Sequence, residues 1–262
     1  MIVAITGAAR GIGLATAQAL KAQGAKVAIG DIDETAIPDG FDLAAKLDVT
    51  DRESFAAFLD QVDAELGPVD VLVNNAGIMP IGPLHEESDA DARRCIDINV
   101  HGVMLGTKLA VERMLPRKKG QIINIASLAG VMPTPGLALY NASKAAVVAF
   151  TEAARQEYKS YGIKVSAVLP SFTNTELVAG TRSPKGQRNN EPGDIAAAVV
   201  KLIGKPRPRA IVPSKFAPTV ALGGLFPARI REASSRFYGL DRIFLDYDPA
   251  ARKAYDERIR DR

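Results

Sequence analysis

The sequence Thr6-Gly-Ala-Ala-Arg-Gly-Ile-Gly13 follows a short apolar run, Ile2–Thr6, and leads into a segment with helical periodicity, Gly11–Gln23. Its three glycines allow a tight turn and let the backbone come close to a pyrophosphate. The helix that begins there offers free N–H groups and a favourable dipole to an anion. Strand, glycine turn and helix in this order predict a dinucleotide-binding unit.

The rest of the chain alternates in the same way between short apolar runs and longer segments with helical spacing. The runs are apolar on both faces, as strands of a parallel sheet between two helix layers must be. We expect strands at Ile2–Thr6, Lys26–Gly30, Val69–Asn74, Gln121–Ala126, Ile163–Leu169 and Arg209–Val212, and helices at Gly11–Gln23, Asp51–Glu65, Ala90–Met114, Tyr140–Tyr161 and Pro192–Ile203. This alternation predicts an α/β fold with a doubly wound, Rossmann-type parallel sheet flanked by helices on both faces.

The end of the chain differs in composition from the part that precedes it. Residues 201–262 carry 14 Lys and Arg against 7 Asp and Glu, whereas residues 1–200 carry 19 against 23. Ala228–Tyr238 and Pro249–Arg262 have the pattern of helices. We expect residues 1–212 to form the dinucleotide-binding Rossmann domain and residues 213–262 to form a helical extension of it. The extension could cover a pocket, make a subunit contact or lie on a membrane surface, but we favour plain packing on the body, because surface helices with an apolar stripe usually face a core.

Composition argues against several classes of protein. With one cysteine and two histidines among 262 residues, we expect no disulfide framework within the chain and no protein-built metal site. No apolar run approaches the roughly 18 residues of a membrane-spanning helix, and the N-terminus begins as a strand without a basic leader. The basic residues form no nucleic-acid-reading motif. We therefore expect a cytoplasmic protein that binds neither metal nor nucleic acid.

An acidic residue at the end of the second expected strand bears on the choice of dinucleotide. Asp31 lies 18 residues beyond Gly13, where its carboxylate can accept hydrogen bonds from the ribose of adenosine and would repel a 2′-phosphate. Arg10 in the glycine turn favours the opposite choice, because it could bind that phosphate. We give more weight to Asp31, which predicts NAD as the cofactor and leaves NADP as the alternative.

These residues, with several further motifs, resemble the short-chain dehydrogenase/reductase family over roughly residues 1–212. The motifs occur in the family's order: the TGxxxGxG turn, Asp48 in Leu47-Asp-Val-Thr50, Asn74-Asn-Ala-Gly77, Asn99, Ser127 and the YxxxK signature Tyr140-Asn-Ala-Ser-Lys144. The resemblance implies an NAD(P)-dependent oxidoreductase and a homo-oligomer, a dimer or tetramer, formed through the helices Ala90–Met114 and Tyr140–Tyr161. The sequence departs from the family at Pro170-Ser171, where Pro-Gly is usual.

The resemblance also implies a set of site residues. The catalytic residues would be Asn99, Ser127, Tyr140 and Lys144. The cofactor would be bound by residues of the glycine turn and of the loops that follow the strands: Gly7, Arg10, Gly11, Ile12, Gly13, Asp31, Asp48, Val49, Asn75, Ala76, Gly77, Tyr140, Lys144, Pro170, Thr173 and Thr175.

Tyr140 and Lys144 lie four residues apart on an expected helix and therefore share one face. A phenol is a poor base at neutral pH, but a neighbouring ammonium lowers its pKa and makes it a plausible general base or acid. By the resemblance, Ser127 would bind the substrate oxygen, and Asn99 would position a water that links Lys144 to solvent.

Apolar loops follow the strands and predict the character of the substrate. The candidate pocket segments are Ile78–Leu84, Leu128–Leu139 and Phe172–Gly180, and their side chains include no arginine that could clamp an anionic group. This composition favours a hydrophobic secondary alcohol or ketone. The alternatives are an NADP-dependent carbonyl reductase and, from another class, a membrane-associated cofactor-binding or scaffold protein.

Overall fold

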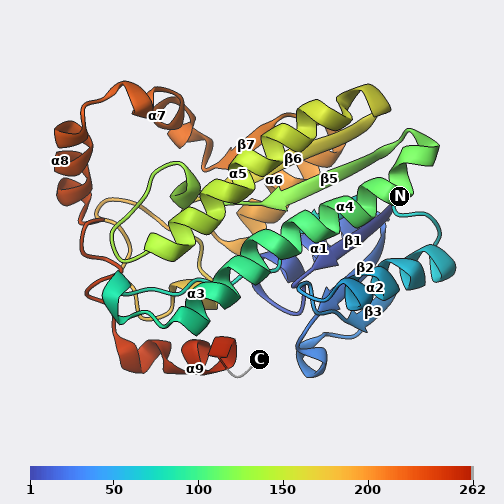
Figure 1. The fold of residues 1–262 in the computed structure, drawn as a ribbon, viewed down its shortest axis with the longest axis horizontal. Coiled ribbons are helices and arrows are strands. Elements are labelled where there is room, and N and C mark those ends of the chain that lie inside the picture. Colours follow the sequence, from blue (N-terminus) through green and yellow to red (C-terminus); the bar gives the residue numbers. More distant parts are fainter. Residues whose placement is uncertain (261–262) are drawn as a thin grey trace.

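Parallel strands form the centre of the computed structural model, which describes residues 1–260 (Figure 1). The strands are β1 (Ile2–Thr6), β2 (Lys26–Asp31), β3 (Leu43–Lys46), β4 (Val71–Asn74), β5 (Gly120–Ile125), β6 (Ile163–Pro170) and β7 (Arg209–Val212). They lie in one seven-stranded sheet in the order β3-β2-β1-β4-β5-β6-β7. The chain thus runs outward from β1 to β3, returns to β4 beside β1 and continues in the other direction. This reversal confirms the doubly wound sheet and creates a switch point between β1 and β4.

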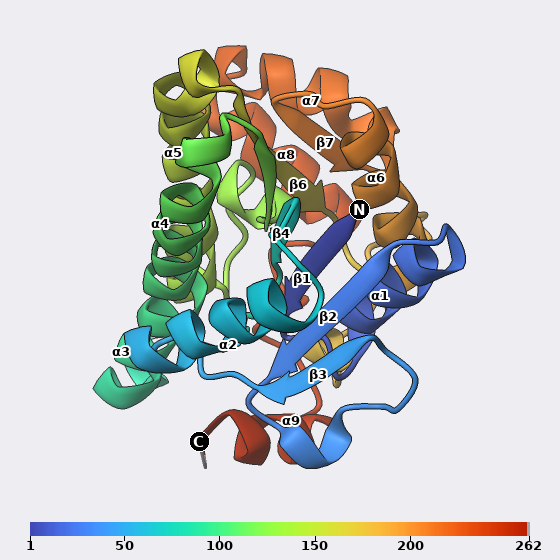
Figure 2. The same cartoon turned by 90° about the vertical axis from the view of Figure 1, so that its right-hand side faces the viewer.

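Helices cover both faces of this sheet, as predicted (Figure 2). One layer consists of α1 (Gly11–Ala22) and α6 (Pro192–Gly204), and the other of α2 (Arg52–Glu65), α4 (Gly102–Met114) and α5 (Ala138–Tyr158). With both faces covered, the sheet presents its edges and the ends of its strands to ligands. The loops at the carboxyl ends of the strands are therefore the place to look for a site.

Side chains alternate along the central strands to fill the two layers. Val3 and Ile5 of β1 belong to the apolar cluster that contains Leu20 of α1. Ala4 lies between them in sequence and belongs to the opposite cluster, which contains Phe55 of α2. Successive side chains of a strand point to opposite faces, so a strand covered on both faces must be apolar throughout. This is why these strands can be recognised as short apolar runs.

The strand β3 is the one that the sequence did not reveal. It lies at the edge of the sheet and pairs with β2. Its sequence, Leu43-Ala-Ala-Lys46, has no β-branched residue, and two of its four side chains are exposed. Strand propensity measures the fit to a half-buried pleated surface, and at this edge little apolar surface is needed.

The long helix expected over Ala90–Met114 is interrupted. The helix α3 (Asp89–Ile96) passes through a π-helical turn, Asp97–His101, into α4. Such turns are rare, and many of those known lie at functional sites. Apolar periodicity does not reveal this one, because a single extra residue changes the spacing of the apolar positions very little.

Residues 213–260 follow β7 and contain three further helices. Of these, α7 (Ala217–Leu222) and α8 (Ala228–Tyr238) project to one side of the sheet, and α9 (Pro249–Arg260) lies beside α3 (Figure 1). The bounds of α8 are those expected. The terminal helix expected to reach Arg262 is described as far as Arg260, and residues 261 and 262 lie outside the described residues. Within residues 1–260, no helix combines the length and the apolar character needed to cross a bilayer.

Candidate active site

The glycine turn after β1 forms a cradle of closely packed backbone. Gly7 and Gly11 have φ angles of +64° and +58°, which favour glycine. A Cβ on Gly13 would lie 2.4 Å from the carbonyl oxygen of Gly7 and 2.6 Å from Nδ2 of Asn75. Arg10, the N-cap of α1, makes no side-chain capping bond, so the N-terminal amides of this helix keep their capacity to bind an anion. The cradle fits the pyrophosphate of a dinucleotide.

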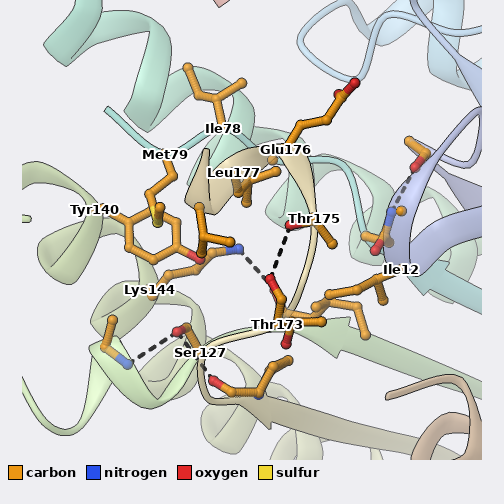
Figure 3. Close-up of a pocket in the computed structure, with 18 of the residues that line it drawn as sticks. Ile12, Ile78, Met79, Ser127, Tyr140, Lys144, Thr173, Thr175, Glu176 and Leu177 are labelled. Atoms are coloured by element: carbon orange, nitrogen blue, oxygen red, sulfur yellow. Dashed lines mark hydrogen bonds between the residues drawn. The ribbon is translucent and has the colours of Figure 1, made fainter. Parts of the chain in front are cut away.

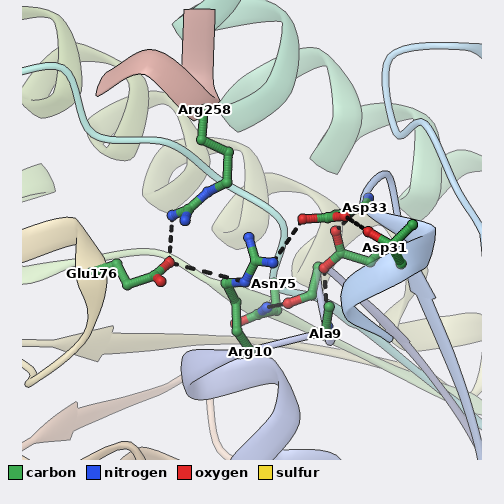
Figure 4. A network of polar contacts seen from close by, with 9 residues as sticks. Ala9, Arg10, Asp31, Asp33, Asn75, Glu176 and Arg258 are labelled. Atoms are coloured by element: carbon green, nitrogen blue, oxygen red, sulfur yellow. Dashed lines mark hydrogen bonds and ion pairs between the residues drawn. The ribbon is translucent and has the colours of Figure 1, made fainter. Parts of the chain in front are cut away.

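Charged side chains beside this turn form a continuous network (Figure 4). The Asp31 carboxylate accepts hydrogen bonds from the backbone N–H of Ala9 and of Asp33, each at 3.0 Å. The Arg10 guanidinium lies 2.7 Å from Oδ2 of Asp33 and 4.0 Å from Oε2 of Glu176. Arg10 is therefore held by two carboxylates. Asp33 and Glu176 are not among the site residues expected from the sequence, although Asp33 is only two residues from Asp31.

One cleft brings nearly all of the expected site residues together. It has a volume of about 1130 Å³ and runs along the carboxyl edge of the sheet. Two of the expected residues, Gly13 and Asn99, do not line it: Gly13 supports the glycine turn from behind, and Asn99 is fully buried. Lining residues from the expected set are Gly7, Arg10, Gly11, Ile12, Asp31, Asp48, Val49, Asn75, Ala76, Gly77, Ser127, Tyr140, Lys144, Pro170, Thr173 and Thr175.

Three polar side chains meet in the middle of this cleft (Figure 3). Ser127 follows β5, and its Oγ accepts a hydrogen bond from the backbone N–H of Ala129 at 3.1 Å. Tyr140 and Lys144 project from α5, with Nζ of Lys144 5.6 Å from the centre of the tyrosine ring. The same Nζ donates to the carbonyl oxygen of Ile125 at 2.9 Å. The end of β5 and the first turns of α5 thus set the positions of all three groups.

Burial shifts the pKa values of Tyr140 and Lys144 and so sets their protonation. It raises the pKa of Tyr140 well above its usual value, and hydrogen bonding with Ser127 opposes the rise only in part. It also lowers the pKa of Lys144 to about 8. We expected the lysine to lower the pKa of the tyrosine. Within the protein, the cost of burying a phenolate sets the direction of the shift instead, so that Tyr140 carries its proton at neutral pH.

Asn99 lies in the π-helical turn and joins two walls of the site. Its Oδ1 accepts from the backbone N–H of Ile78 at 2.8 Å, and its Nδ2 donates to the carbonyl oxygen of Ile78 at 2.8 Å and to Oγ of Ser143 at 3.0 Å. It thereby fixes the loop after β4 to α5, the helix that carries Tyr140 and Lys144. Its expected role in holding a water stays a prediction.

Only some of the residues that line the apolar end of the cleft come from the segments predicted to form it. Of the predicted segments, Met79, Met132, Leu137, Phe172, Leu177 and Val178 line it, whereas Leu84, Val131 and Leu139 do not. The C-terminal extension supplies further walls, among them Leu240, Phe244 and Tyr255. The ring of Phe244 stacks on that of Phe172, with centres 5.4 Å apart. The only signal of this in the sequence is the enrichment of Phe and Tyr in the last quarter of the chain.

The helix α9 is attached to the site by buried polar contacts. Arg252 is fully buried, and its guanidinium donates to the carbonyl oxygens of Leu177, at 2.7 Å, and of Met79. The Tyr255 hydroxyl accepts from the backbone N–H of Met79 at 2.8 Å. These bonds tie the loops after β4 and β6 to the end of the chain.

Arginines also line the rim of the cleft, which the apolar loops gave no reason to expect. Arg93 and Arg94 come from α3, and Arg258 comes from α9. Arg94 donates to the carbonyl oxygen of Ile259 at 2.6 Å, and Arg258 pairs with Glu176. Arg94 thus connects α3 to α9, and Arg258 connects α9 to the loop after β6.

Comparisons with known proteins agree with this geometry. A family model described as short chain dehydrogenase matches residues 1–186. The cis-4-hydroxycyclohexanecarboxylate dehydrogenase of Sinomonas cyclohexanicum is 40% identical over 220 residues, 77% of this chain and 88% of that protein. The galactitol 2-dehydrogenase of Agrobacterium fabrum (strain C58) is 39% identical over 211 residues, 77% of this chain and 82% of that protein.

A solved structure shows the same architecture. It is a short-chain dehydrogenase/reductase from Burkholderia phymatum in complex with NAD, with a TM-score of 0.76 and 26% identity, covering 84% of this chain and 92% of that one. The chain belongs to the short-chain dehydrogenase/reductase family. It is an oxidoreductase that acts on alcohol or ketone groups.

The attachment of α9 can be tested through its buried cation. In Arg252→Met, the carbonyl groups of Met79 and Leu177 lose their donor, and Asp256, 3.0 Å from Nε of Arg252, loses its partner. We expect the free energy of unfolding, measured by urea denaturation, to fall by about 3 kcal/mol. Lys253→Met, on the exposed side of the same helix, is the control and should change it by less than about 0.5 kcal/mol. Equal losses in both variants would contradict the assignment.

Proposed function

We propose that this protein transfers a hydride between NAD and a hydrophobic secondary alcohol or ketone, with Tyr140 as general acid and base. The observation that carries the proposal is the convergence of Ser127, Tyr140 and Lys144 on the cleft that also contains the glycine turn. This arrangement and the dehydrogenases among its relatives favour an enzyme over a scaffold that only binds a cofactor.

Each of the three polar groups has a distinct part in the reaction. Tyr140 gives its proton to the carbonyl oxygen during reduction and takes it back during oxidation. Ser127 donates a hydrogen bond to the same oxygen and stabilises the charge that develops on it. Its bond to the carbonyl oxygen of Pro170 is long, at 3.4 Å, so its proton can turn toward a substrate. The Lys144 ammonium stabilises the tyrosinate. A bound nicotinamide dinucleotide would supply or accept the hydride.

The residues around the cleft divide the binding of the cofactor among them. In this proposal, the glycine turn and the N-terminus of α1 hold the pyrophosphate, Asp31 holds the adenosine ribose, Asp48 contacts the adenine and Lys144 contacts the nicotinamide ribose. Residues 1–212 then form the NAD-binding catalytic domain, and residues 213–262 an extension that completes the substrate pocket.

The network at Arg10 supports NAD over NADP. Because Asp33 and Glu176 already hold the Arg10 guanidinium, a 2′-phosphate would have to compete with two carboxylates for it. Asp31 adds a further negative charge beside the turn. The alternative, an NADP-dependent carbonyl reductase, would need Arg10 to leave both partners.

The apolar end of the cleft supports a hydrophobic substrate. Met79, Leu137, Ile243 and Phe244 form one buried cluster with Tyr140, so the proton donor faces apolar side chains. One relative is named for a hydroxycyclohexane carboxylate, which makes a ring-shaped secondary alcohol a reasonable first substrate to test.

We also propose that the protein forms a homo-oligomer, a dimer or tetramer, through the helices expected at Ala90–Met114 and Tyr140–Tyr161, which correspond to α3 with α4 and to α5. The helices α4 and α5 lie side by side over one face of the sheet (Figure 2). Met104 of α4, a large apolar residue, is 37% exposed, and in this proposal a second subunit covers it.

Removal of the phenol oxygen should abolish the chemistry and spare the binding. For Tyr140→Phe, we expect kcat for oxidation of cyclohexanol or cis-4-hydroxycyclohexanecarboxylate to fall at least about a hundredfold, because the general acid–base group is lost. NADH binding, measured by fluorescence titration, should change little. Tyr158→Phe removes a hydroxyl from the same helix outside the cleft and serves as the control. Turnover retained by Tyr140→Phe would refute the assigned base.

The preference between the two dinucleotides should depend on one carboxylate. We expect NADH to bind at least about tenfold more tightly than NADPH, since the charge of Asp31 opposes a 2′-phosphate. Asp31→Asn keeps a hydrogen-bond acceptor, removes the charge and should reduce this ratio. Asp39→Asn, an exposed change in the same loop region, should leave the ratio as it is. A preference of the unmodified protein for NADPH would overturn the argument.

The pH dependence of reduction should reflect the buried lysine. Lys144 is charged below its pKa of about 8 and neutral above it, whereas Tyr140 keeps its proton over this range. We therefore expect kcat/KM for ketone reduction by NADH to be constant below that pH and to decline above it. A parallel titration of NADH affinity separates an effect on binding from one on chemistry. A profile that stays flat well above this pH would be incompatible with a role for the ammonium.

A further inference from the structure

The two helices that project from the body form a surface that packs only in part on the rest of the molecule. We call residues 214–238, which include α7 and α8, the C-terminal arm. Neither helix has a buried residue, although each contains large apolar side chains. In Figure 1 the arm lies to one side of the sheet and its two helix layers. Phe216 and Val220 pack against the core cluster that contains Leu169, so packing on the body explains these two side chains but not the apolar residues of the turn and of α8.

Apolar exposure is concentrated on this arm. Six of the eleven exposed large apolar residues in the described part of the chain lie on it, so exposed apolar side chains gather here more than elsewhere on the surface. Leu225 and Phe226, in the turn between the helices, are 78% and 46% exposed, and Phe237 is 74% exposed. On α8, the spacing of Ile230, Ala233 and Phe237 places these three side chains on one face. The remaining members of the six are Leu222, Ile230 and Tyr238.

Positive charge surrounds these apolar side chains. The arm carries four cations and one acid: Lys215, Arg229, Arg231, Arg236 and Glu232. The neighbouring loop, residues 181–190, has three exposed cations and no acid: Arg182, Lys185 and Arg188. This loop contacts the arm through the backbone N–H of Lys185, which donates to the carbonyl oxygen of Tyr238 at 3.1 Å. Among the ion pairs of residues 1–260, none involves these seven cations.

The cleft of the active site reaches the arm. Phe216 and Thr219 from its beginning, and Ser234 and Tyr238 from α8, line the same cleft as Tyr140. On α8, Ser234 and Tyr238 lie four residues apart and form a stripe next to the one formed by Ile230 and Phe237. The helix thus borders the cleft along one stripe, and the adjacent stripe presents apolar side chains to the outside.

We propose that the C-terminal arm docks on an anionic lipid bilayer and that the cleft takes its substrate from that surface. Exposed Leu, Ile and Phe side chains flanked by arginines are the features of an interfacial helix, which buries its apolar face at the headgroup boundary. A bilayer could also bury the exposed side chains of Leu225 and Phe226 in the turn between the helices. A second copy of the arm is a less suitable partner, because two arms in a symmetric contact would bring like charges together. The part of the proposal that concerns substrate rests on the proposed function, whereas the docking does not.

Vesicle binding by the full chain tests the docking. We expect the protein to sediment with vesicles of equal parts phosphatidylcholine and phosphatidylglycerol and to stay in solution with phosphatidylcholine alone. Replacing Arg229 and Arg236 by Gln should lower the partition coefficient about fivefold for each cation removed. Leu225→Glu with Phe237→Glu should abolish binding. None of these side chains lines the cleft, so NADH affinity and the unfolding temperature should remain as in the unmodified protein.

A matched control places the same change on the opposite side of the fold. Tyr161 is 48% exposed and lies just before β6, at the edge of the sheet away from the cleft. Tyr161→Glu should leave vesicle binding unchanged. The docking proposal is wrong if the anionic vesicles do not bind the protein or if Tyr161→Glu weakens binding as much as the arm variants. It is also wrong if light scattering shows that the arm variants change the oligomer while vesicle binding stays the same.

Turnover of a ketone in vesicles and of one in water distinguishes delivery of substrate from the bilayer from the proposed catalytic function. For a long-chain ketone dissolved in the anionic vesicles, Leu225→Glu with Phe237→Glu should raise KM at least about tenfold. For cyclohexanone in water, the same variant should behave as the unmodified protein does. Vesicle binding without turnover of either ketone would contradict the proposed function and leave the docking standing. Equal KM values for the vesicle-borne ketone would contradict delivery from the bilayer.

Discussion

The amide of Asn75 joins the two halves of the sheet where they diverge. Its Nδ2 donates to the carbonyl oxygens of Thr6, at 2.9 Å, and of Gly7, at 2.8 Å, and its backbone N–H donates to Oγ1 of Thr6 at 3.0 Å. The turn after β1 and the loop after β4 therefore hold one another in place at the switch point. A Cβ on Gly7 would lie 2.7 Å from Cα of Ala76, which leaves room for glycine alone. The shape of the phosphate cradle, and with it the position of every group along the cleft, depends on this contact.

The chemistry depends on a second constraint, the burial of a cation and a phenol beside each other. Burying Lys144 costs free energy, and the carbonyl oxygen of Ile125 offsets only part of it, as the lowered pKa shows. The π-helical turn contributes through Asn99, whose bonds to Ile78 and Ser143 fix α5 against the loop after β4. A lysine with a pKa lowered to about 8 therefore lies next to a tyrosine that keeps its proton.

Much of this could be predicted from the sequence, because the signals are local. The glycine turn, the apolar strands and the four-residue spacing of Tyr140 and Lys144 each lie within one segment. Spacing says nothing about dielectric environment, however, and the direction of the tyrosine's pKa shift follows from burial that only the fold reveals. Contacts across the chain were equally hidden. The bond from Met79 to Tyr255 joins residues 176 positions apart, and no periodicity relates them.

The composition of the C-terminal extension is compatible with several roles, because it does not show which of its arginines are buried. Arg252 and the arginines of α8 belong to the same basic segment, yet their surroundings are opposite. Arg252 meets backbone carbonyls at the ends of two loops and an aspartate one turn along its helix, so its charge is satisfied inside the protein. Arg229 and Arg236 lie on a helix with no buried side chain and have no ion-pair partner among residues 1–260. The first kind of arginine fixes a wall of the pocket, and the second leaves a charged, apolar surface at the border of the same pocket. Because Ser234 and Tyr238 line the cleft on that border, the helix that carries the exposed arginines also forms part of the wall of the cleft.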